Sequence, residues 1–365
     1  MLSTFRRDLH QIPELGLNTE KTMRYIKKQL AGLHCKIYSP IPNSVVAYFD
    51  RNKEETIAFR SDMDALPMAE QNTFSFRSEN GNMHACGHDG HMSMLLGLAY
   101  RLDRRQELAY NVLLIFQPGE EDPGGAELLI KAGLFEPYRI KALFGFHIYP
   151  NLPAGKIITR PGVMMAGACN LQIEIKGVSS HAAMPEKGKD ALLAGADLVS
   201  HTKKKEAMLF DKDTFHLLHF GTFESGNAFN IVSDHAKIQG TIRYFEPFVF
   251  DQIMQEIKEE IESVKEVYQV SIDWHIDQHY PPLVNDPDLI DRIRSENKEI
   301  GLLEKPVLIA EDFAFYAKTV PAAFFFIGSG KSFPLHSNLF DFNEQLLPEG
   351  VSFYEKVLDM FSGKP

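Results

Sequence analysis

Apolar and polar positions alternate along the first 150 residues in a way that predicts helices and strands in turn. In the segment 19–33, Met23, Ile26, Leu30 and Leu33 fall on one face of a helix that begins after a threonine, which predicts an amphipathic helix. Short apolar runs rich in Val, Ile and Phe follow at 45–49, 56–60, 111–116 and 141–146. Because helical segments separate these runs, the pattern is typical of an α/β layer with a largely parallel sheet.

The pattern changes between residues 169 and 280. This stretch holds four strand-like runs and two helical segments, at 170–177, 190–204, 215–223, 236–245, 250–267 and 268–276. The order strand, helix, two strands, helix, strand is typical of a four-stranded antiparallel sheet with both helices on one face. We therefore predict an inserted α+β domain at 169–280, within a domain that residues 1–168 and 281–365 form together.

Composition excludes several classes of protein. With 365 residues, of which 44% are hydrophobic and 24% charged, the chain is long enough for two globular domains. The net charge of −11 and the short basic run 203–205 argue against nucleic acid as a partner. No apolar run is long enough to span a membrane, and the N-terminus does not resemble a signal peptide. Together with three widely spaced cysteines, this leads us to expect a cytoplasmic protein.

Polar residues that can bind metals follow several of the predicted strands. They are Asp62 and Asp64, Glu120 and Glu121, His147, and His336 in the loop after 322–328. In open α/β sheets, ligands bind outside the carboxyl ends of the strands, so this recurrence predicts one shared site. Taken singly, each residue also has a plainer interpretation, because a Glu-Glu pair is commonly a solvated loop and a lone histidine is commonly structural.

The segment "NMHACGHDGH", residues 82–91, is harder to explain as packing. Cys86 and His88, separated by one glycine, are poor packing material but have good spacing for chelation, so a metal site is the better interpretation. His84, Asp89 and His91 are interpreted as scaffolding, with Asp89 as the N-cap of the helix that follows.

Nine motifs, in order along nearly the whole chain, resemble the di-metal amidohydrolases that include aminoacylases, hippurate hydrolases, auxin-conjugate hydrolases and N-acetyldiaminopimelate deacetylases. The motifs are "LHQIPELGLNTEKT", "RSDMDALP", "HACGHDGH", "FQPGEEDPGGA", "FGFH", "SSHAAMP", "NIVSDHAKIQGTIR", "AEDFAFY" and "LHSNLFDFNE". The resemblance implies a zinc-exopeptidase-like catalytic domain, with the insert acting as a lid and as a dimerisation domain.

By this resemblance, two divalent ions would be held by Cys86, His88, Glu121, His147 and His336. A ligand set of thiolate, imidazole and carboxylate suits Zn, Mn, Co or Ni better than Mg or Ca. In a two-metal site a bound water can reach a pKa of about 7, which gives a hydroxide nucleophile at neutral pH. Cys86 is the candidate bridging ligand.

The resemblance also implies roles for four other residues. Glu120 would be the general base that takes a proton from water and delivers it to the leaving amine. His181 would stabilise the oxyanion, across a dimer contact in this family. Asn230 and Arg243 would hold the substrate carboxylate, a task that suits the forked guanidinium. The plainer interpretations are a loop histidine for His181 and a solvent-facing strand residue for Arg243.

Asp62 and Asp64 are expected to orient a ligand histidine or the metals, with a simple turn as the competing interpretation.

The expected reaction is hydrolysis of an N-acyl amino acid to a carboxylic acid and a free amino acid, with N-acetyl-diaminopimelate as a narrower candidate substrate. Two other classes stay open: a hydrolase with Cys86 as its nucleophile, and a non-catalytic metal- or ligand-binding protein. The expected partners are this small-molecule substrate and a second copy of the chain, bound through the insert.

Overall fold

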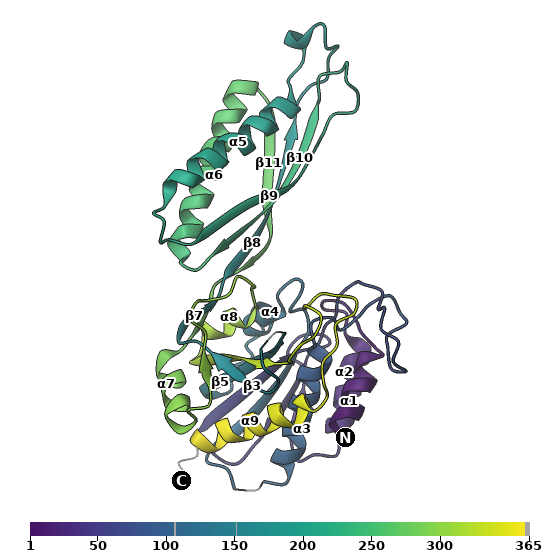
Figure 1. Cartoon of the computed structure of the whole chain (residues 1–365), viewed down its shortest axis with the longest axis vertical. Helices are drawn as coiled ribbons and strands as arrows, with labels where there is room; N and C mark the ends of the chain where they lie inside the picture. Colours follow the sequence, from purple (N-terminus) through teal and green to yellow (C-terminus); the bar gives the residue numbers. More distant parts are fainter. Residues whose placement is uncertain (106, 151, 362–365) are drawn as a thin grey trace. The chain divides into compact units, whose positions relative to one another are not determined.

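The computed structural model describes residues 1–105, 107–150 and 152–361 and divides into two compact units (Figure 1). Unit 1 comprises Met1–Met164, Leu283–Pro306 and Glu311–Pro365, and unit 2 comprises Met165–Pro282 and Val307–Ala310. The sequence prediction placed the boundaries at 168 and 280 and assigned all residues after 280 to the first domain. The short segment 307–310 joins unit 2 because the Ala166 N–H donates to the carbonyls of Val307 and Ile309.

Unit 1 is built on an eight-stranded sheet with the order β1-β2-β4-β3-β5-β14-β6-β13. The strands are β1 (Lys36–Tyr38), β2 (Val45–Phe49), β3 (Glu55–Asp62), β4 (Asn111–Gln117), β5 (Arg139–Tyr149), β6 (Ile157–Thr159), β13 (Gly301–Leu302) and β14 (Ala322–Gly328). The four central strands, β4, β3, β5 and β14, run parallel, so their carboxyl ends meet at one edge of the sheet. A small two-stranded sheet pairs β7 (Gly162–Met165) with β12 (Leu283–Asn285).

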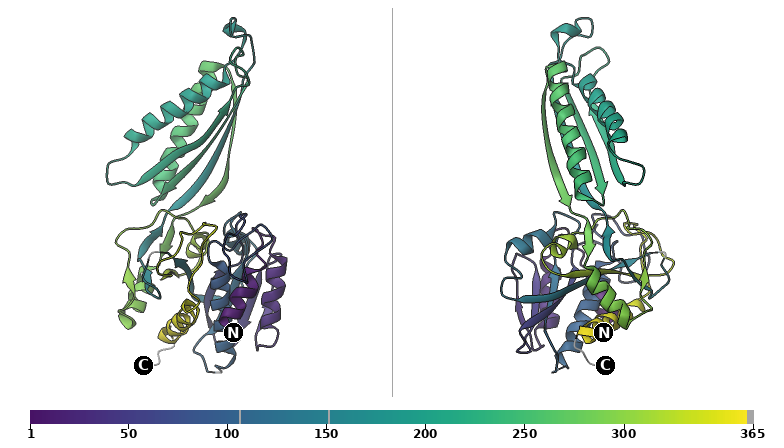
Figure 2. Two further views of the ribbon diagram at one scale, coloured as in Figure 1. Left: turned by 45° about the vertical axis from the view of Figure 1, so that its right-hand side comes forward. Right: turned by 90° about the vertical axis from the view of Figure 1, so that its left-hand side faces the viewer.

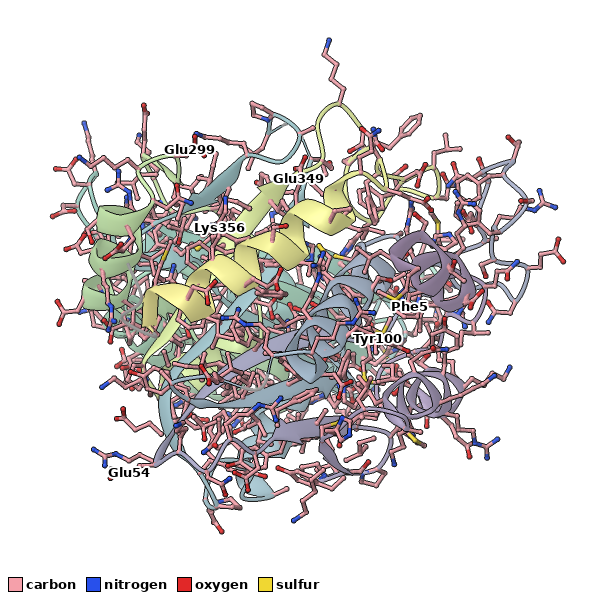
Figure 3. The ribbon with its side chains drawn as sticks, turned by 90° about the horizontal axis from the view of Figure 1, so that it is seen from below. Phe5, Glu54, Tyr100, Glu299, Glu349 and Lys356 are labelled. Atoms are coloured by element: carbon pink, nitrogen blue, oxygen red, sulfur yellow. The ribbon has the colours of Figure 1, made fainter. Side chains whose placement is uncertain are left out.

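In the part of the chain that the structure describes, seven helices surround this sheet: α1 (Leu2–His10), α2 (Glu20–Leu30), α3 (His88–Asp103), α4 (Gly125–Lys131), α7 (Pro287–Glu296), α8 (Phe313–Ala317) and α9 (Leu346–Phe361). The predicted amphipathic helix is α2, which buries Ile26 and Leu30. Helix α3 packs against the sheet and lies between α1 and α9 (Figure 3), so nearly all of its residues are buried. Burial on all faces follows from this central position, and it includes the polar residues His88, Asp89 and His91.

Unit 2 has a four-stranded antiparallel sheet with the order β11-β8-β10-β9. Its elements are β8 (Gly167–Lys176), the 3₁₀ helix η1 (Pro185–Lys187), α5 (Ala191–Leu209), β9 (His216–Ser225), β10 (His235–Tyr244), α6 (Pro247–Tyr268) and β11 (Ser271–Tyr280). Both helices cover one face of the sheet (Figure 2), and the buried residues alternate along β8 as they do in a half-covered sheet. The mixed sheet and this separate antiparallel sheet confirm the predicted α/β class with an α+β insert.

Asp89 does not cap α3, and that prediction is wrong. The N-cap position belongs to Gly87, whose φ of 83° lies in the left-handed region, and Asp89 sits in the first turn. Its carboxylate instead accepts hydrogen bonds from His10 Nδ1 at 2.9 Å and from Arg6 Nε at 3.2 Å. Asp89 therefore joins α1 to α3, and the other nitrogen of His10 contacts Glu70 at 3.1 Å.

This buried network predicts a pH-dependent contribution to stability. Burial opposes a charge on His10, but Asp89 and Glu70 outweigh burial and raise its pKa from 6.5 to about 9. A raised pKa means that protonated His10 stabilises the fold fully below its unfolded pKa, and that this stabilisation is lost as the pH rises through about 9.

We expect His10→Gln to lower the free energy of unfolding by up to about 3 kcal/mol more at about pH 6 than at about pH 10. Urea unfolding at the two pH values measures this difference. His219→Gln, which changes an exposed histidine that has no ion pair among the described residues, is the control and should show no such change. An equal effect of His10→Gln at both pH values would contradict the prediction.

Candidate metal centre

The carboxyl edge of the unit 1 sheet brings the predicted ligands together. Glu121 follows β4, His147 lies near the end of β5, Cys86 and His88 open α3, and His336 lies in the loop after β14. The donor atoms of Cys86, His88 and Glu121 all lie within 4.8 Å of one another. His147 Nε2 is 3.3 Å from Cys86 Sγ, and His336 Nε2 is 3.3 Å from Glu121 Oε1. The five side chains form one cluster.

Hydrogen bonds aim the two buried histidines of this cluster. The Nδ1–H of His88 donates to the carbonyl of Asp64 at 2.9 Å, and that of His147 donates to the carbonyl of Ile148 at 2.7 Å. The lone pair on Nε2 of each ring therefore faces the cluster, an arrangement typical of metal-ligating histidines. His88 Nε2 is buried and has no hydrogen-bond partner among the described residues. A cation would satisfy this nitrogen, so the donor set fits a divalent ion.

The electrostatics of the cluster suit metal ligation better than thiol chemistry. Burial lowers the pKa of His88 and of His147, which keeps both rings in the neutral form that binds metals. Burial also raises the pKa of Cys86, and Glu121 and Glu120 add to this effect. A nucleophilic cysteine needs a lowered pKa and an electropositive environment, so this site disfavours Cys86 as a nucleophile.

Asp64 holds the segment that carries the two glutamates. The backbone N–H of Glu120 donates to Asp64 Oδ1 at 3.0 Å, and that of Glu121 donates to Oδ2 at 3.1 Å. Since the Asp64 carbonyl also accepts from His88, one residue positions the candidate base and two candidate ligands. The interpretation of this aspartate as part of a simple turn is excluded, because its side chain is fully buried and bonded.

Asp62 and His91 support the centre from behind. His91 Nε2 accepts from the Ile148 N–H at 2.9 Å, so its proton is on Nδ1, which donates to Asp62 Oδ1 at 2.7 Å. His91 lies among groups that could hold a metal, but both of its nitrogens are engaged. His91 is therefore scaffolding, as the sequence interpretation had it, and it fixes the backbone directly after His147.

The sequence interpretation missed a buried charged network beside Glu120. Arg60 Nε donates to Gln117 Oε1 at 2.8 Å, and its Nη2 donates to Asp312 Oδ1 at 2.7 Å. Oxygens of Glu120, Glu311 and Asp312 lie within 4.8 Å of one another. Burial raises the pKa of Glu120, and the negative charge of Glu311 raises it further. One signal was present in the sequence, since an arginine inside an apolar strand needs buried partners.

The remaining predicted residues lie in unit 2, and the structure brings together only two of them. The Ala182 N–H donates to the Asn230 carbonyl at 3.0 Å, and His181 pairs with Ile231 in an isolated antiparallel β-bridge. The segments that carry His181 and Asn230 are therefore neighbours. Arg243 lies near the far end of β10, which starts at His235 beside these segments. At about 3.3 Å per residue, Arg243 lies roughly 26 Å along the strand from His235.

A cavity of about 530 Å³ adjoins the metal centre at Glu121. Its walls come from the segments 15–18, 65–67 and 121–123, all in unit 1. The lining is mainly apolar and includes Leu15, Leu17, Leu66, Pro67 and Pro123. An apolar group bound beside the metal ligands would therefore lose its contact with water here.

These features define a metal-dependent hydrolase, with a buried Cys, His and carboxylate centre at the carboxyl edge of a mixed sheet. Residues 58–360 match the pattern of peptidase family M20/M25/M40, and the chain belongs to that family. It is 37% identical over 367 residues to an uncharacterized hydrolase of Staphylococcus epidermidis, with 97% of this chain and 96% of the relative covered. A further uncharacterized hydrolase, from Staphylococcus saprophyticus, is 36% identical over 370 residues, covering 98% and 96% of the two chains.

Solved structures show the same fold. A protein of methicillin-resistant Staphylococcus aureus superposes with a TM-score of 0.90 at 29% identity, covering 98% of this chain and 96% of that one. The YxeP protein of Bacillus subtilis, a dinuclear metal binding peptidase from the M20 family, has a TM-score of 0.83 at 27% identity, with coverage of 99% and 97%. The resemblance that the motifs indicated is thereby confirmed.

Elemental analysis can test the metal centre. We expect Cys86→Ala to lose at least one of the ions that the purified wild-type protein carries, because the thiol lies between His147 and Glu121. Cys169→Ala is the matched control, because Cys169 is also buried but lies in unit 2, whereas the cluster lies in unit 1. This variant should keep the wild-type metal content. Wild-type content in Cys86→Ala would contradict the assignment of Cys86 as a ligand.

Proposed function

We propose that this protein hydrolyses the amide bond of an N-acyl amino acid and releases a carboxylic acid and a free amino acid. The observation that carries the proposal is the position of Glu120, held by Asp64 next to the cluster of Cys86, His88 and Glu121. N-acetyl-diaminopimelate is the narrower candidate substrate, which would make the enzyme a deacetylase.

The three cysteines are free, which supports a reducing compartment such as the cytoplasm.

Five residues would hold two divalent ions, namely Cys86, His88, Glu121, His147 and His336. When bound, such ions supply Lewis-acid activation of water and of the scissile carbonyl. Zn, Mn, Co and Ni all suit this ligand set. The similarity of this chain to the YxeP protein, which binds two metal ions, supports a pair of ions here.

Glu120 would take the proton from the attacking water and deliver it to the departing nitrogen. A carboxylate with a raised pKa is suited to both steps, because it accepts a proton readily and returns it within one reaction cycle. Burial next to Glu311 provides the raised pKa of Glu120, so the base does not depend on a histidine.

The cavity beside Glu121 would take the acyl group, since its walls are mainly apolar. Arg243 and Asn230 would bind the carboxylate of the amino acid, and His181 would stabilise the negative charge on the carbonyl oxygen. Because Arg243 lies at the opposite end of the unit 2 sheet from His181 and Asn230, we propose that Arg243 of one chain works with the partner's His181 and the partner's Asn230.

Unit 2 has a surface that would suit the contact between two copies. Large apolar side chains are exposed at the end that carries His181 and Asn230: Leu192, Leu193, Phe223, Phe229 and Ile231. Strand β9 is also an edge of the sheet and can accept a further strand. Exposed apolar side chains around a free edge are typical of an interaction site, which supports a homodimer through unit 2.

Two alternatives remain as outcomes of the tests below. A cysteine-nucleophile hydrolase is disfavoured by the burial of Cys86 and its raised pKa. A metal- or ligand-binding protein without activity would have no use for a base, yet Glu120 is present and held in position.

Glu120→Gln tests the catalytic role of this residue. We expect it to lower kcat about 10²- to 10⁴-fold on the best of N-acetyl, N-benzoyl and N-acetyl-diaminopimelate substrates, because the base is lost while the ligands remain. Metal content should stay at the wild-type level. Glu127→Gln, in the following helix α4, serves as the control and should keep full activity.

Full turnover by a metal-loaded Glu120→Gln protein would contradict the mechanism. Hydrolysis by the wild-type protein that survives complete removal of metal would favour the cysteine nucleophile. Absence of turnover by the metal-loaded wild type on every substrate of the panel would favour the binding protein.

Phe229→Asp tests the proposed dimer. Phe229 is 100% exposed, so the change should leave the fold of unit 2 intact. We expect wild-type protein to elute with the mass of two chains, and the variant to shift toward a single chain and to lose hydrolysis together with the dimer. Met208→Asp, at a 77% exposed position at the other end of α5, should do neither. A wild-type protein that is monomeric at micromolar concentration would overturn the dimer.

A further inference from the structure

A second cavity, of about 640 Å³, lies in unit 1 and is lined by none of the metal-centre residues. It is enclosed by the loop and strand 153–157, the loop 297–300 and the N-terminal half of α9, from Pro348 to Lys356. We call it the α9 pocket. The proposed reaction assigns nothing to this pocket.

One side of α9 places opposite charges at the two ends of the pocket. Glu349, Ser352, Phe353 and Lys356 all line it, at the spacing of a single helical face. Figure 3 shows Glu349 and Lys356 along the same side of α9, with Glu299 beyond them. The two charged residues are seven positions apart, so their Cα atoms are separated by about 10.5 Å along the helix.

The charges that line the pocket are not paired with one another. Four charged residues line the pocket, Lys156, Glu299, Glu349 and Lys356, and among the described residues none of them takes part in an ion pair. Glu355 and Asp359, which do not line the pocket, pair with arginines of the α3 region. Both Glu349 and Lys356 are exposed to the pocket opening. An anion and a cation that face one cavity without meeting leave room for a ligand that carries both charges.

Gly155 leaves room for the Glu349 carboxylate at the wall opposite α9. Gly155 has a φ of +73°, and a Cβ atom at this position would lie 1.9 Å from Glu349 Oε2. The Glu349 carboxylate therefore rests directly against the backbone of the opposite wall. On the same wall, Lys156 Nζ donates to the Glu299 carbonyl at 2.6 Å, which ties the two loops together.

The floor between the two charges is mainly apolar, with the hydroxyl of the exposed Ser352 beside it. Phe353 is 4% exposed and Ile300 is 2% exposed, and Ile157 is partly buried beside them. The Phe353 ring packs edge-on against Phe325 with centroids 4.9 Å apart. The pocket thus offers a carboxylate, an apolar surface and an ammonium group in sequence along α9.

We propose that the α9 pocket binds a free α-amino acid with an apolar side chain, in its zwitterionic form. The ammonium group of the ligand would pair with Glu349 and its carboxylate with Lys356, while the side chain covers Phe353. Two charge-assisted hydrogen bonds of about 2.8 Å, with about 3 Å between the charged groups of the ligand, span about 9 Å. Glu349 and Lys356 extend from Cα atoms about 10.5 Å apart along the helix, and both side chains are exposed, so their charged ends can close to this length.

A link to the catalytic centre would follow from the packing behind the floor. Phe353 also lies against Phe146, with centroids 6.5 Å apart, and Phe146 directly precedes the candidate ligand His147. If the proposed hydrolysis is correct, the ligand would be of the same class as the amino acid that the reaction releases. The binding itself does not depend on that function.

Calorimetric titration of the metal-loaded protein with L-leucine tests the proposal. We expect Glu349→Gln and Lys356→Met each to weaken the binding of L-leucine about ten-fold or more, since each removes one charge contact. Leucinamide, which lacks the carboxylate, and 4-methylpentanoate, which lacks the ammonium group, should bind the wild type about ten-fold more weakly than leucine. Lys331→Met, at a lysine that lines a different cavity, is the control and should bind leucine like the wild type.

Two outcomes would overturn the proposal. One is no binding of L-leucine to the wild type up to about 10 mM. The other is equal binding by the wild type and both variants, which would place the amino acid elsewhere, for example at the metal centre. Hydrolysis without added amino acid is measured on the same variants and should be unchanged, because neither residue belongs to the metal centre. Failure of binding and failure of catalysis are therefore scored separately.

Discussion

The metal centre depends on one aspartate. The two carboxylate oxygens of Asp64 accept the N–H groups of Glu120 and Glu121, and its carbonyl accepts the Nδ1–H of His88. A candidate base and a candidate carboxylate ligand from one segment, and a candidate imidazole ligand from another, are thus held by a single buried residue. Burying a carboxylate is costly unless hydrogen bonds satisfy it. Here the bonds that satisfy Asp64 are the same ones that shape the site.

The charges around this centre are arranged in two layers. Closest to the cluster, Asp62 and His91 fix the backbone after His147. Behind them, Arg60 bonds to Gln117 and Asp312 and ties the end of β3 to the end of β4 and to the start of α8. Removing one partner from such a buried network leaves an uncompensated charge, which is far more destabilising than losing a surface pair. The same buried bonds therefore hold the site in place and stabilise the edge of the sheet.

Unit 2 has a different physical character. Its sheet is covered on one face only, its edge strand β9 is free, and large apolar side chains are exposed at the end that carries His181. Arg243 lies at the other end of the same sheet. A surface of this kind supports the proposal that a second copy of the chain takes part in the chemistry. The chain has no helix, among its described residues, that is long and apolar enough to cross a membrane.

The sequence by itself determined the alternation of strands and helices, the antiparallel insert and the chemical types of the residues at the strand ends. These follow from local periodicity and from residue chemistry, which the order of amino acids contains directly. Only the tertiary structure decided which nitrogen of each histidine faces the cluster, that Asp89 binds His10 rather than capping α3, and that Arg60 reaches Asp312. Apart from the bond between His147 and its neighbour Ile148, these features depend on hydrogen-bond partners far apart in the chain, up to 252 positions for Arg60 and Asp312. Periodicity carries no information about such pairs.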